Sequence, residues 1–209
     1  MDNKKVKGYA YGVIASVSYG LNPLFALPLY ASGIRVDSVL FYRYVFALLF
    51  LAVMMKMSGQ SFALKRNEIL PVAVMGLLFS FSSLFLFQSF NYMDAGIAST
   101  ILFMYPVLVA VIMAVFFKER LSVVKIASIA TAFVGISMLY KGEGGATLSM
   151  TGVCLVLMSS LTYALYIVGV NRSSLKEMPG LKLTFYAILF GSLVYIVRLR
   201  GGMDLQWLT

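Results

Sequence analysis

The sequence has no histidine, a single cysteine (Cys154) and few charged residues. The lone cysteine excludes a disulfide within the chain, and the lack of histidine excludes Cys/His zinc sites and histidine-based triads. Only 12% of the 209 residues are charged, whereas 61% are hydrophobic. So few charges cannot cover a soluble protein of this length with a polar surface. The composition therefore predicts an all-α integral membrane protein, without a metal site or a cofactor.

Basic residues outnumber acidic ones, 17 against 8. They form short clusters between apolar runs, which is not the pattern of a nucleic-acid-binding surface. The expected partners are therefore the lipid bilayer and a small molecule, with no nucleic acid. Seven apolar runs are long enough to span a bilayer, and the first lacks a cleavage site and should be retained. These runs are residues 8–34, 36–55, 69–93, 95–117, 121–140, 146–171 and 179–197.

The basic residues also predict the orientation of the chain. With seven spans, one side collects twelve Lys and Arg residues and the other only Arg35, Lys141, Arg198 and Arg200. Positive residues accumulate in cytoplasmic loops. We therefore expect the N-terminus to be cytoplasmic, although Arg198 and Arg200 run against the rule.

An internal repeat emerges when the chain is shifted by 144 residues without a gap. The shift aligns identical residues over two helices and their loop: Gly8 with Gly152, Ser16 with Ser160, Tyr19 with Tyr163, Leu21 with Leu165, Phe41-Tyr42 with Phe185-Tyr186, Phe46 with Phe190, and Leu49 with Leu193. The first unit contains five predicted helices, so the second must insert upside down, as in many secondary transporters. The predicted domains are a first repeat, 1–141, and the start of a second, 146–209. Three further helices would follow residue 209, so we expect a C-terminally truncated piece of a ten-helix protein.

The stretch from residue 95 to residue 140, "AGIASTILFMYPVLVAVIMAVFFKERLSVVKIASIATAFVGISMLY", resembles the EamA family of the drug/metabolite transporter superfamily. The resemblance rests on a small-residue helix start, a mid-helix proline, a Glu-Arg-Leu corner and a closing helix rich in small residues. These features are Ala98-Ser99-Thr100, Pro106, Glu119-Arg120-Leu121 and the series Ala127, Thr131 and Gly135. The openings "SYGLNP" and "TYALYI" and the position of Arg43 are also similar to the family. The resemblance implies two inverted five-helix repeats and a multi-pass transporter of the bacterial inner membrane, exporting small metabolites such as amino acids.

The segment "YGLNPLFALPLY" contains residues that disrupt helices within an apolar run. Pro23 and Pro28 free the carbonyls of Tyr19 and Leu24, and an unpaired carbonyl is costly in lipid. Either this helix lines a wet cavity, or it is kinked and Asn22 bonds a neighbouring helix. Pro106 repeats the pattern by freeing the carbonyl of Leu102.

Several residues outside this segment also have either a functional or a structural interpretation. A charge within a span is usually functional, so Arg43 is either an anion contact or an interfacial anchor. Glu119 and Arg120 are predicted to form a structural helix corner. The small residues Gly8, Gly12, Ser16 and Gly20 suit helix packing, and the series Ala127, Thr131 and Gly135 suits packing or a homodimer contact. The predicted substrate-cavity residues are Tyr19, Asn22, Pro23, Arg43, Gln88, Thr100, Tyr105, Pro106, Tyr163, Tyr166 and Tyr186.

Three functions compete: a secondary carrier, an intramembrane enzyme and a membrane scaffold. An intramembrane enzyme usually needs paired acids, histidine or a Ser/Lys arrangement within the membrane. Here Asp37, Asp94, Glu119, Glu143 and Glu177 all lie at predicted helix ends or in loops. A scaffold does not explain why helix breaks recur in corresponding helices. The sequence therefore favours a carrier working by alternating access, and not an enzyme.

Overall fold

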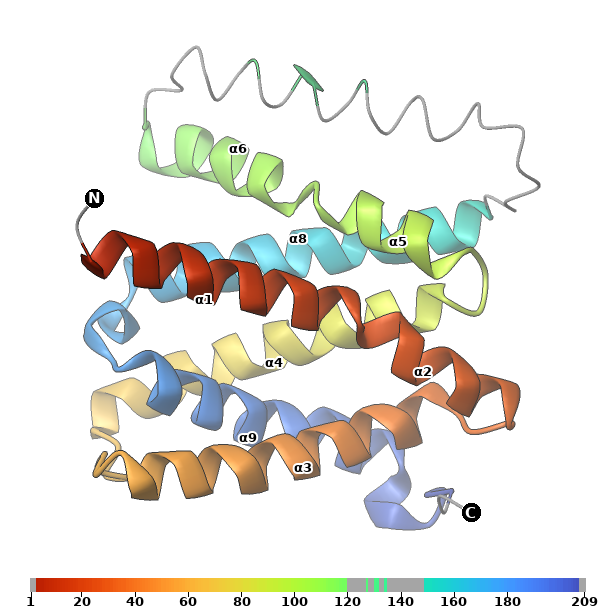
Figure 1. Ribbon diagram of the computed structural model, residues 1–209, viewed down its shortest axis with the longest axis horizontal. Helices are drawn as coiled ribbons and strands as arrows, with labels where there is room; N and C mark the ends of the chain where they lie inside the picture. Colours follow the sequence, from red (N-terminus) through yellow and green to blue (C-terminus); the bar gives the residue numbers. More distant parts are fainter. Residues whose placement is uncertain (1–2, 120–126, 128–129, 132–133, 135–148, 207–209) are drawn as a thin grey trace.

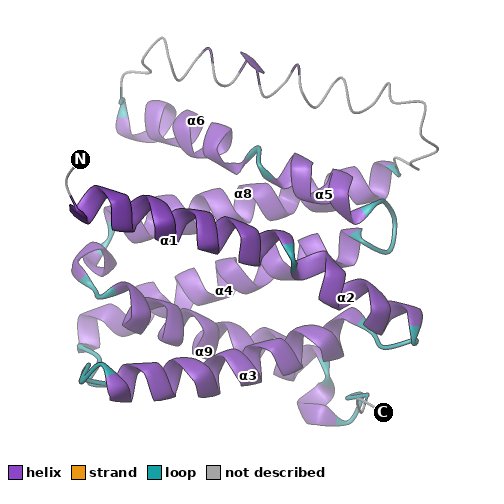
Figure 2. Cartoon of the chain, viewed as in Figure 1, coloured by secondary structure: helices purple, strands orange, loops and turns teal. Residues whose placement is uncertain are grey.

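The computed structural model describes residues 3–119, 127, 130, 131, 134 and 149–206. These residues form helices joined by short turns, without an assigned strand among them (Figure 1, Figure 2). The α-helices are α1 (Asn3–Gly20), α2 (Asn22–Ala31), α3 (Val36–Met57), α4 (Arg66–Ser89), α5 (Ala95–Leu102), α6 (Tyr105–Phe117), α8 (Met150–Arg172) and α9 (Gly180–Arg198). Two short 3₁₀ turns, η1 (Ser174–Glu177) and η2 (Arg200–Gly202), follow α8 and α9.

Six stretches of the described chain are long and apolar enough to cross a membrane. Two of them are interrupted helices, α1 with α2 and α5 with α6, and the others are α3, α4, α8 and α9. Six of the seven predicted spans are therefore found, and the remaining one, 121–140, lies mostly outside the described residues. Many apolar side chains face outward, as expected where lipid is the solvent; Phe116 is 75% exposed and Leu70 72%.

The spans from α1 to α6 alternate in direction, and α9 runs opposite to α8, so the bundle has two ends (Figure 1). We call the near end the one where α1, α4 and α9 begin and α3, α6 and α8 end. The far end is where α3, α5 and α8 begin and α2, α4 and α9 end.

The first span breaks where the sequence predicts. Helix α1 ends at Gly20, α2 begins at Asn22, and Pro23 lies in the first turn of α2. Proline is tolerated there because its missing N–H would have had no helical partner. The backbone N–H of Leu21 still donates to the carbonyl of Val17 at 3.2 Å, so the chain bends without separating the two helices.

The second break separates α5 from α6, with Pro106 in the first turn of α6. The carbonyl of Leu102 accepts a hydrogen bond of 3.2 Å from Ser160 Oγ of α8. A neighbouring helix therefore satisfies the carbonyl that Pro106 would otherwise leave unpaired, as membrane helices require. This break contributes to the packing between helices.

Helix α4 lies at the centre of the bundle and packs against both α8 and α9. Against α8, Ser82 Oγ donates to the carbonyl of Ser159 at 3.0 Å, and Ser159 Oγ donates to the carbonyl of Ser82 at 2.7 Å. Against α9, a Cβ atom added to Gly76 would lie 2.5 Å from the carbonyl oxygen of Ala187. Small residues and buried hydroxyls thus hold these helices together, which is the usual means of association in a membrane.

Candidate functional site

The break between α1 and α2 lies opposite a cationic residue of α3. Arg43 Nη2 donates a hydrogen bond of 2.9 Å to Asn22 Oδ1, and the guanidinium carbon lies 4.5 Å from the centre of the Phe87 ring. Arg43 is seven residues beyond the start of α3, about 10 Å along the helix axis. A charge at this depth is expensive unless it is paired or used. Among the described residues, its polar side-chain partner is the Asn22 amide, and no carboxylate forms an ion pair with it.

A pocket of about 330 Å³ opens beside this pair, between α2 and α3. Apolar side chains form most of its wall, and Asn22, Tyr42 and Arg43 supply its polar groups. The remaining lining residues are Phe25, Ala26, Leu29, Val39 and Phe46. Such a pocket suits a small molecule with an apolar body and a polar or anionic group.

A row of aromatic rings crosses the bundle from α6 to α9. Ring centres lie 4.8 Å apart for Tyr105 and Tyr163, 5.9 Å for Tyr163 and Tyr166, and 5.4 Å for Tyr166 and Phe79. These separations are typical of aromatic pairs that attract one another. The row joins residues of α6, α8 and α4 into one continuous surface.

Tyr19, on the last turn of α1, lies in the neighbourhood of Arg43, Tyr105 and Tyr163. The structure therefore brings together Tyr19, Asn22, Arg43, Tyr105 and Tyr163 from α1, α2, α3, α6 and α8. Pro23 and Tyr166 lie beside members of this group, and Pro106 directly follows Tyr105.

The row continues into a polar cluster that sequence reasoning missed. Tyr44 lies 6.4 Å from Phe79 and 4.7 Å from Tyr195 between ring centres. The Tyr44 hydroxyl is within hydrogen-bonding distance of Ser80 Oγ (3.1 Å) and Ser83 Oγ (3.3 Å), and the Tyr195 hydroxyl donates to the carbonyl of Ser80 at 3.0 Å. The available signal was the group of serines, Ser80, Ser82 and Ser83, within an otherwise apolar span.

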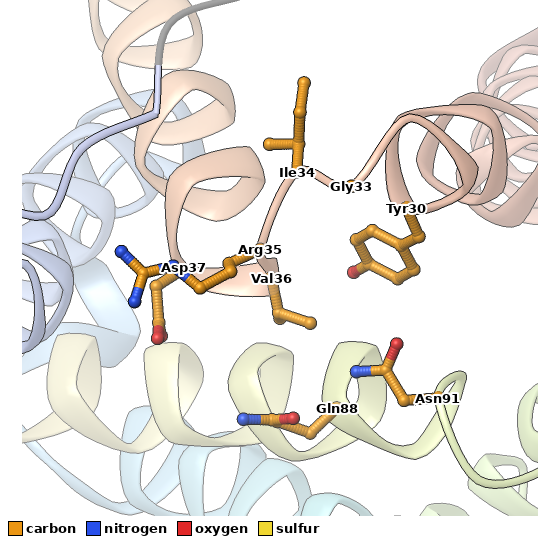
Figure 3. A pocket seen from close by; sticks show the side chains of 8 residues that line it. All are labelled: Tyr30, Gly33, Ile34, Arg35, Val36, Asp37, Gln88 and Asn91. Carbon is orange, nitrogen blue, oxygen red and sulfur yellow. The ribbon is translucent and has the colours of Figure 1, made fainter.

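Gln88 lies in a second pocket at the far end, also of about 330 Å³. Gln88 lies on α4 and Asn91 in the turn that follows it, with the Asn91 amide pointing toward Tyr30 of α2 (Figure 3). Arg35 extends away and donates to the carbonyl of Asp204. Gly33, Ile34, Val36 and Asp37 complete the wall. This pocket is more polar than the one beside Arg43, and its position makes it a vestibule at the far end.

Three predicted residues lie apart from the Arg43 region. Thr100 Oγ1 donates to the carbonyl of Gly96 in its own helix at 2.9 Å. The Tyr186 hydroxyl donates to the carbonyl of Phe62 at the near end. Glu119 forms an ion pair with Arg172 of α8, whose guanidinium lies over the Phe117 ring at 4.5 Å; Arg120 lies outside the described residues.

Three acidic residues at described helix ends are engaged with nearby groups. Asp37 pairs with Arg198, Glu68 accepts a hydrogen bond from the N–H of Lys65, and Asp94 Oδ1 accepts from Gly96 and Ile97. Within the described part of the chain, no three His, Cys, Asp or Glu side chains gather as metal ligands do. The arrangement supplies a cation, amides, hydroxyls and rings, which are groups for binding a solute.

Comparison with known proteins decides the family. The pattern of the EamA-like transporter family matches residues 6–141, which is more than half of the chain. The chain belongs to this family. The family match and the apolar helices identify a multi-pass membrane protein of a transporter family, which is compatible with the prediction that the protein is not an enzyme.

Curated relatives have the same general description. The uncharacterized transporter YxxF of Bacillus subtilis (strain 168) is 29% identical over 131 residues, which cover 60% of this chain and 42% of that protein. An uncharacterized transporter of Archaeoglobus fulgidus is 28% identical over 102 residues, covering 49% of this chain and 36% of the relative. The matched part thus spans about two fifths of the length of these relatives. No solved structure matches the chain significantly.

Proposed function

We propose that this EamA protein exports small amphipathic metabolites that carry a carboxylate, such as amino acids, across the bacterial inner membrane. Arg43 carries the proposal, because it is a cation within a span whose side chain lines a pocket and has no carboxylate partner among the described residues. An incoming carboxylate would supply the missing negative charge through charge-assisted hydrogen bonds. Asn22 would hold the guanidinium in place for it.

The apolar part of such a solute would contact aromatic rings. Phe25 and Phe46 line the pocket, and Tyr19 lies in the neighbourhood of Tyr105 and Tyr163. Rings on five helices offer a surface that adapts to several side-chain shapes, since stacking and apolar contact require little directional matching. This supports a carrier of amphipathic metabolites rather than of inorganic anions.

Alternating access would move the solute between the two ends of the bundle. Helix breaks in two spans and the predicted inverted repeats favour this mechanism, because they let one unit tilt against the other around a site within the membrane. We propose that the near end faces the cytoplasm, following the excess of basic residues predicted on that side. The competing function, an intramembrane enzyme, is disfavoured because Asp37, Glu68, Asp94 and Glu119 are each engaged at helix ends.

Transport by proteoliposomes containing the full-length protein tests this function. Phenylalanine and phenethylamine share an aromatic body, but only phenylalanine has a carboxylate, so phenylalanine should be carried and phenethylamine should not. Arg43→Gln should weaken phenylalanine uptake by at least about tenfold, since a hydrogen bond to a charged group contributes about 1.5–3 kcal/mol. Arg66→Gln, which changes an exposed arginine at the start of α4, is the matched control. Equal transport of both solutes would contradict the carboxylate assignment, and transport of no solute would contradict the carrier itself.

A further inference from the structure

Two tyrosines make equivalent hydrogen bonds at opposite ends of the bundle. At the far end, the Tyr42 hydroxyl of α3 donates to the carbonyl of Gln206 at 3.2 Å. At the near end, the Tyr186 hydroxyl of α9 donates to the carbonyl of Phe62. The shift of 144 residues that aligns the predicted repeats places Tyr42 at the position of Tyr186 and Phe62 at the position of Gln206. Donor and acceptor are therefore both repeat-related, which supports an inverted two-fold relationship between α3 and α9.

At the far end, the segment that follows α9 folds back over the start of α3. At the near end, the segment that follows α3 folds back over the start of α9. At the far end, the backbone N–H of Gln206 also donates to Ser38 Oγ at 3.2 Å. At the near end, Lys182 Nζ donates to the carbonyl of Ala63, and the Phe62 ring lies 5.7 Å from that of Phe185. We call the Tyr42–Gln206 contact the far latch and the Tyr186–Phe62 contact the near latch.

We propose that the far and near latches are the alternating gate contacts of this carrier, one released at a time. The proposal rests on the proposed function, since only an alternating-access protein has two gates. Inverted repeats exchange conformations during transport, so two repeat-equivalent contacts at opposite ends become unequal whenever one end opens. Both latches are formed in this structure.

The latches differ in strength because an ion pair reinforces only the far latch, whereas Lys182 makes a single charged hydrogen bond at the near latch. Arg198 binds both carboxylate oxygens of Asp37 at the far end, at 2.6 and 3.1 Å. The repeat shift puts Met54 and Leu181 at the corresponding near-end positions, and neither can form an ion pair.

The far end also has a charged hydrogen bond to a backbone carbonyl, in addition to its ion pair. Arg35 Nη2 donates to the carbonyl of Asp204 at 2.6 Å. Pro179 is the repeat equivalent of Arg35 and has no side-chain donor. The near latch should therefore release more readily, so the resting protein opens toward its near end.

Distances between spin labels test the two latches separately. Cysteines would be introduced into a Cys154→Ser background at exposed positions, Ser32 with Met203 across the far end and Ser58 with Glu177 across the near end. Measurements on the whole protein in lipid, without added solute, would compare Tyr186→Phe, Tyr42→Phe and the control Tyr92→Phe. Tyr92 is a half-exposed tyrosine at the far end, and no hydrogen bond of its hydroxyl is found among the described residues. Phenylalanine keeps the ring and removes only the donor.

Tyr186→Phe should raise the open-to-closed ratio of the near pair about fivefold, the effect of one lost hydrogen bond, and leave the far pair unchanged. Tyr42→Phe alone should move the far pair less, and the double change Tyr42→Phe with Asp37→Asn should open it. Unchanged distances in all latch variants would overturn the proposal, even if melting temperature fell, because the latches would then be static packing contacts. Correct distance shifts without transport of any solute would instead refute the proposed function and leave the latches as conformational contacts.

Discussion

Arg43 on α3 and Asn22 on α2 meet at the point where the first span is broken, with 2.9 Å between Nη2 and Oδ1. Because α2 begins at Asn22, the amide lies on the first turn of a helix rather than within a continuous one. This turn directs the amide toward α3, where Arg43 also lies against Phe87. The helix break and the membrane-embedded cation therefore belong to one structure.

Asn22→Leu should reduce solute affinity while leaving the fold intact. Leucine fits an apolar pocket wall but cannot hold the Arg43 guanidinium, so binding of a carboxylate should weaken about tenfold, which corresponds to about 1.4 kcal/mol. Affinity and melting temperature would be measured on the same purified variant. Asn171→Leu, at the exposed near end of α8, is the control. A lower melting temperature with intact affinity would show that Asn22 is a packing residue.

Gly76→Ala should destabilise the protein because α4 and α9 approach each other closely there. The new Cβ would lie 2.5 Å from the backbone carbonyl oxygen of Ala187, so the helices must separate. Overpacking of this kind costs about 1–3 kcal/mol. The matched change Gly180→Ala, where no atom lies within 4 Å, should be neutral or stabilising. Thermal unfolding in detergent would compare the two, and equal melting temperatures would contradict the close contact.

Thiol labelling should show that the near end faces the cytoplasm. In a Cys154→Ser background, a membrane-impermeant maleimide added to intact cells should label Tyr92→Cys at the far end. It should not label Met57→Cys at the near end, which is 83% exposed and should react only in inside-out vesicles. The expectation follows from the retention of basic residues on the cytoplasmic side. The reverse labelling pattern would show that the near end faces the outside. The resting protein would then open toward the outside instead of the cytoplasm.

The spans and their breaks could be predicted from the sequence because they depend on local properties. Twenty apolar residues must form a helix in lipid, and a proline removes a backbone hydrogen-bond donor wherever it lies. Six described spans and the interruptions before Pro23 and Pro106 accordingly agree with expectation. The structure places no described span where the sequence predicted a loop.

The site could be predicted only in part because it depends on contacts between distant helices. Arg43 was recognisable as a charge within a span, but its amide partner was not, since Asn22 had two plausible roles. The Tyr44–Ser80–Tyr195 cluster was missed because tyrosine and serine are common in membrane helices and only packing makes them converge. Gln88 and Thr100 matched the residue types of a cavity, yet one lies in the far-end vestibule and the other bonds its own helix.

Pro23→Ala tests whether the break itself has a function. Proline within a helix costs about 3 kcal/mol, but Pro23 lies in the first turn of α2, where the cost is far smaller. The melting temperature should therefore rise only slightly as α1 and α2 gain the chance to form one continuous helix.

Transport should nevertheless fall in this variant, because a straighter helix would turn Asn22 away from Arg43. The coupling between Pro23 and Asn22 can be measured by comparing the solute affinities of Pro23→Ala, Asn22→Leu and the double variant Pro23→Ala, Asn22→Leu. If the break acts by orienting Asn22, the second change should add little to the loss of affinity, since coupled residues do not give additive effects. Fully additive losses would show that Pro23 and Asn22 act separately, and unchanged transport by Pro23→Ala would show that the bend is dispensable.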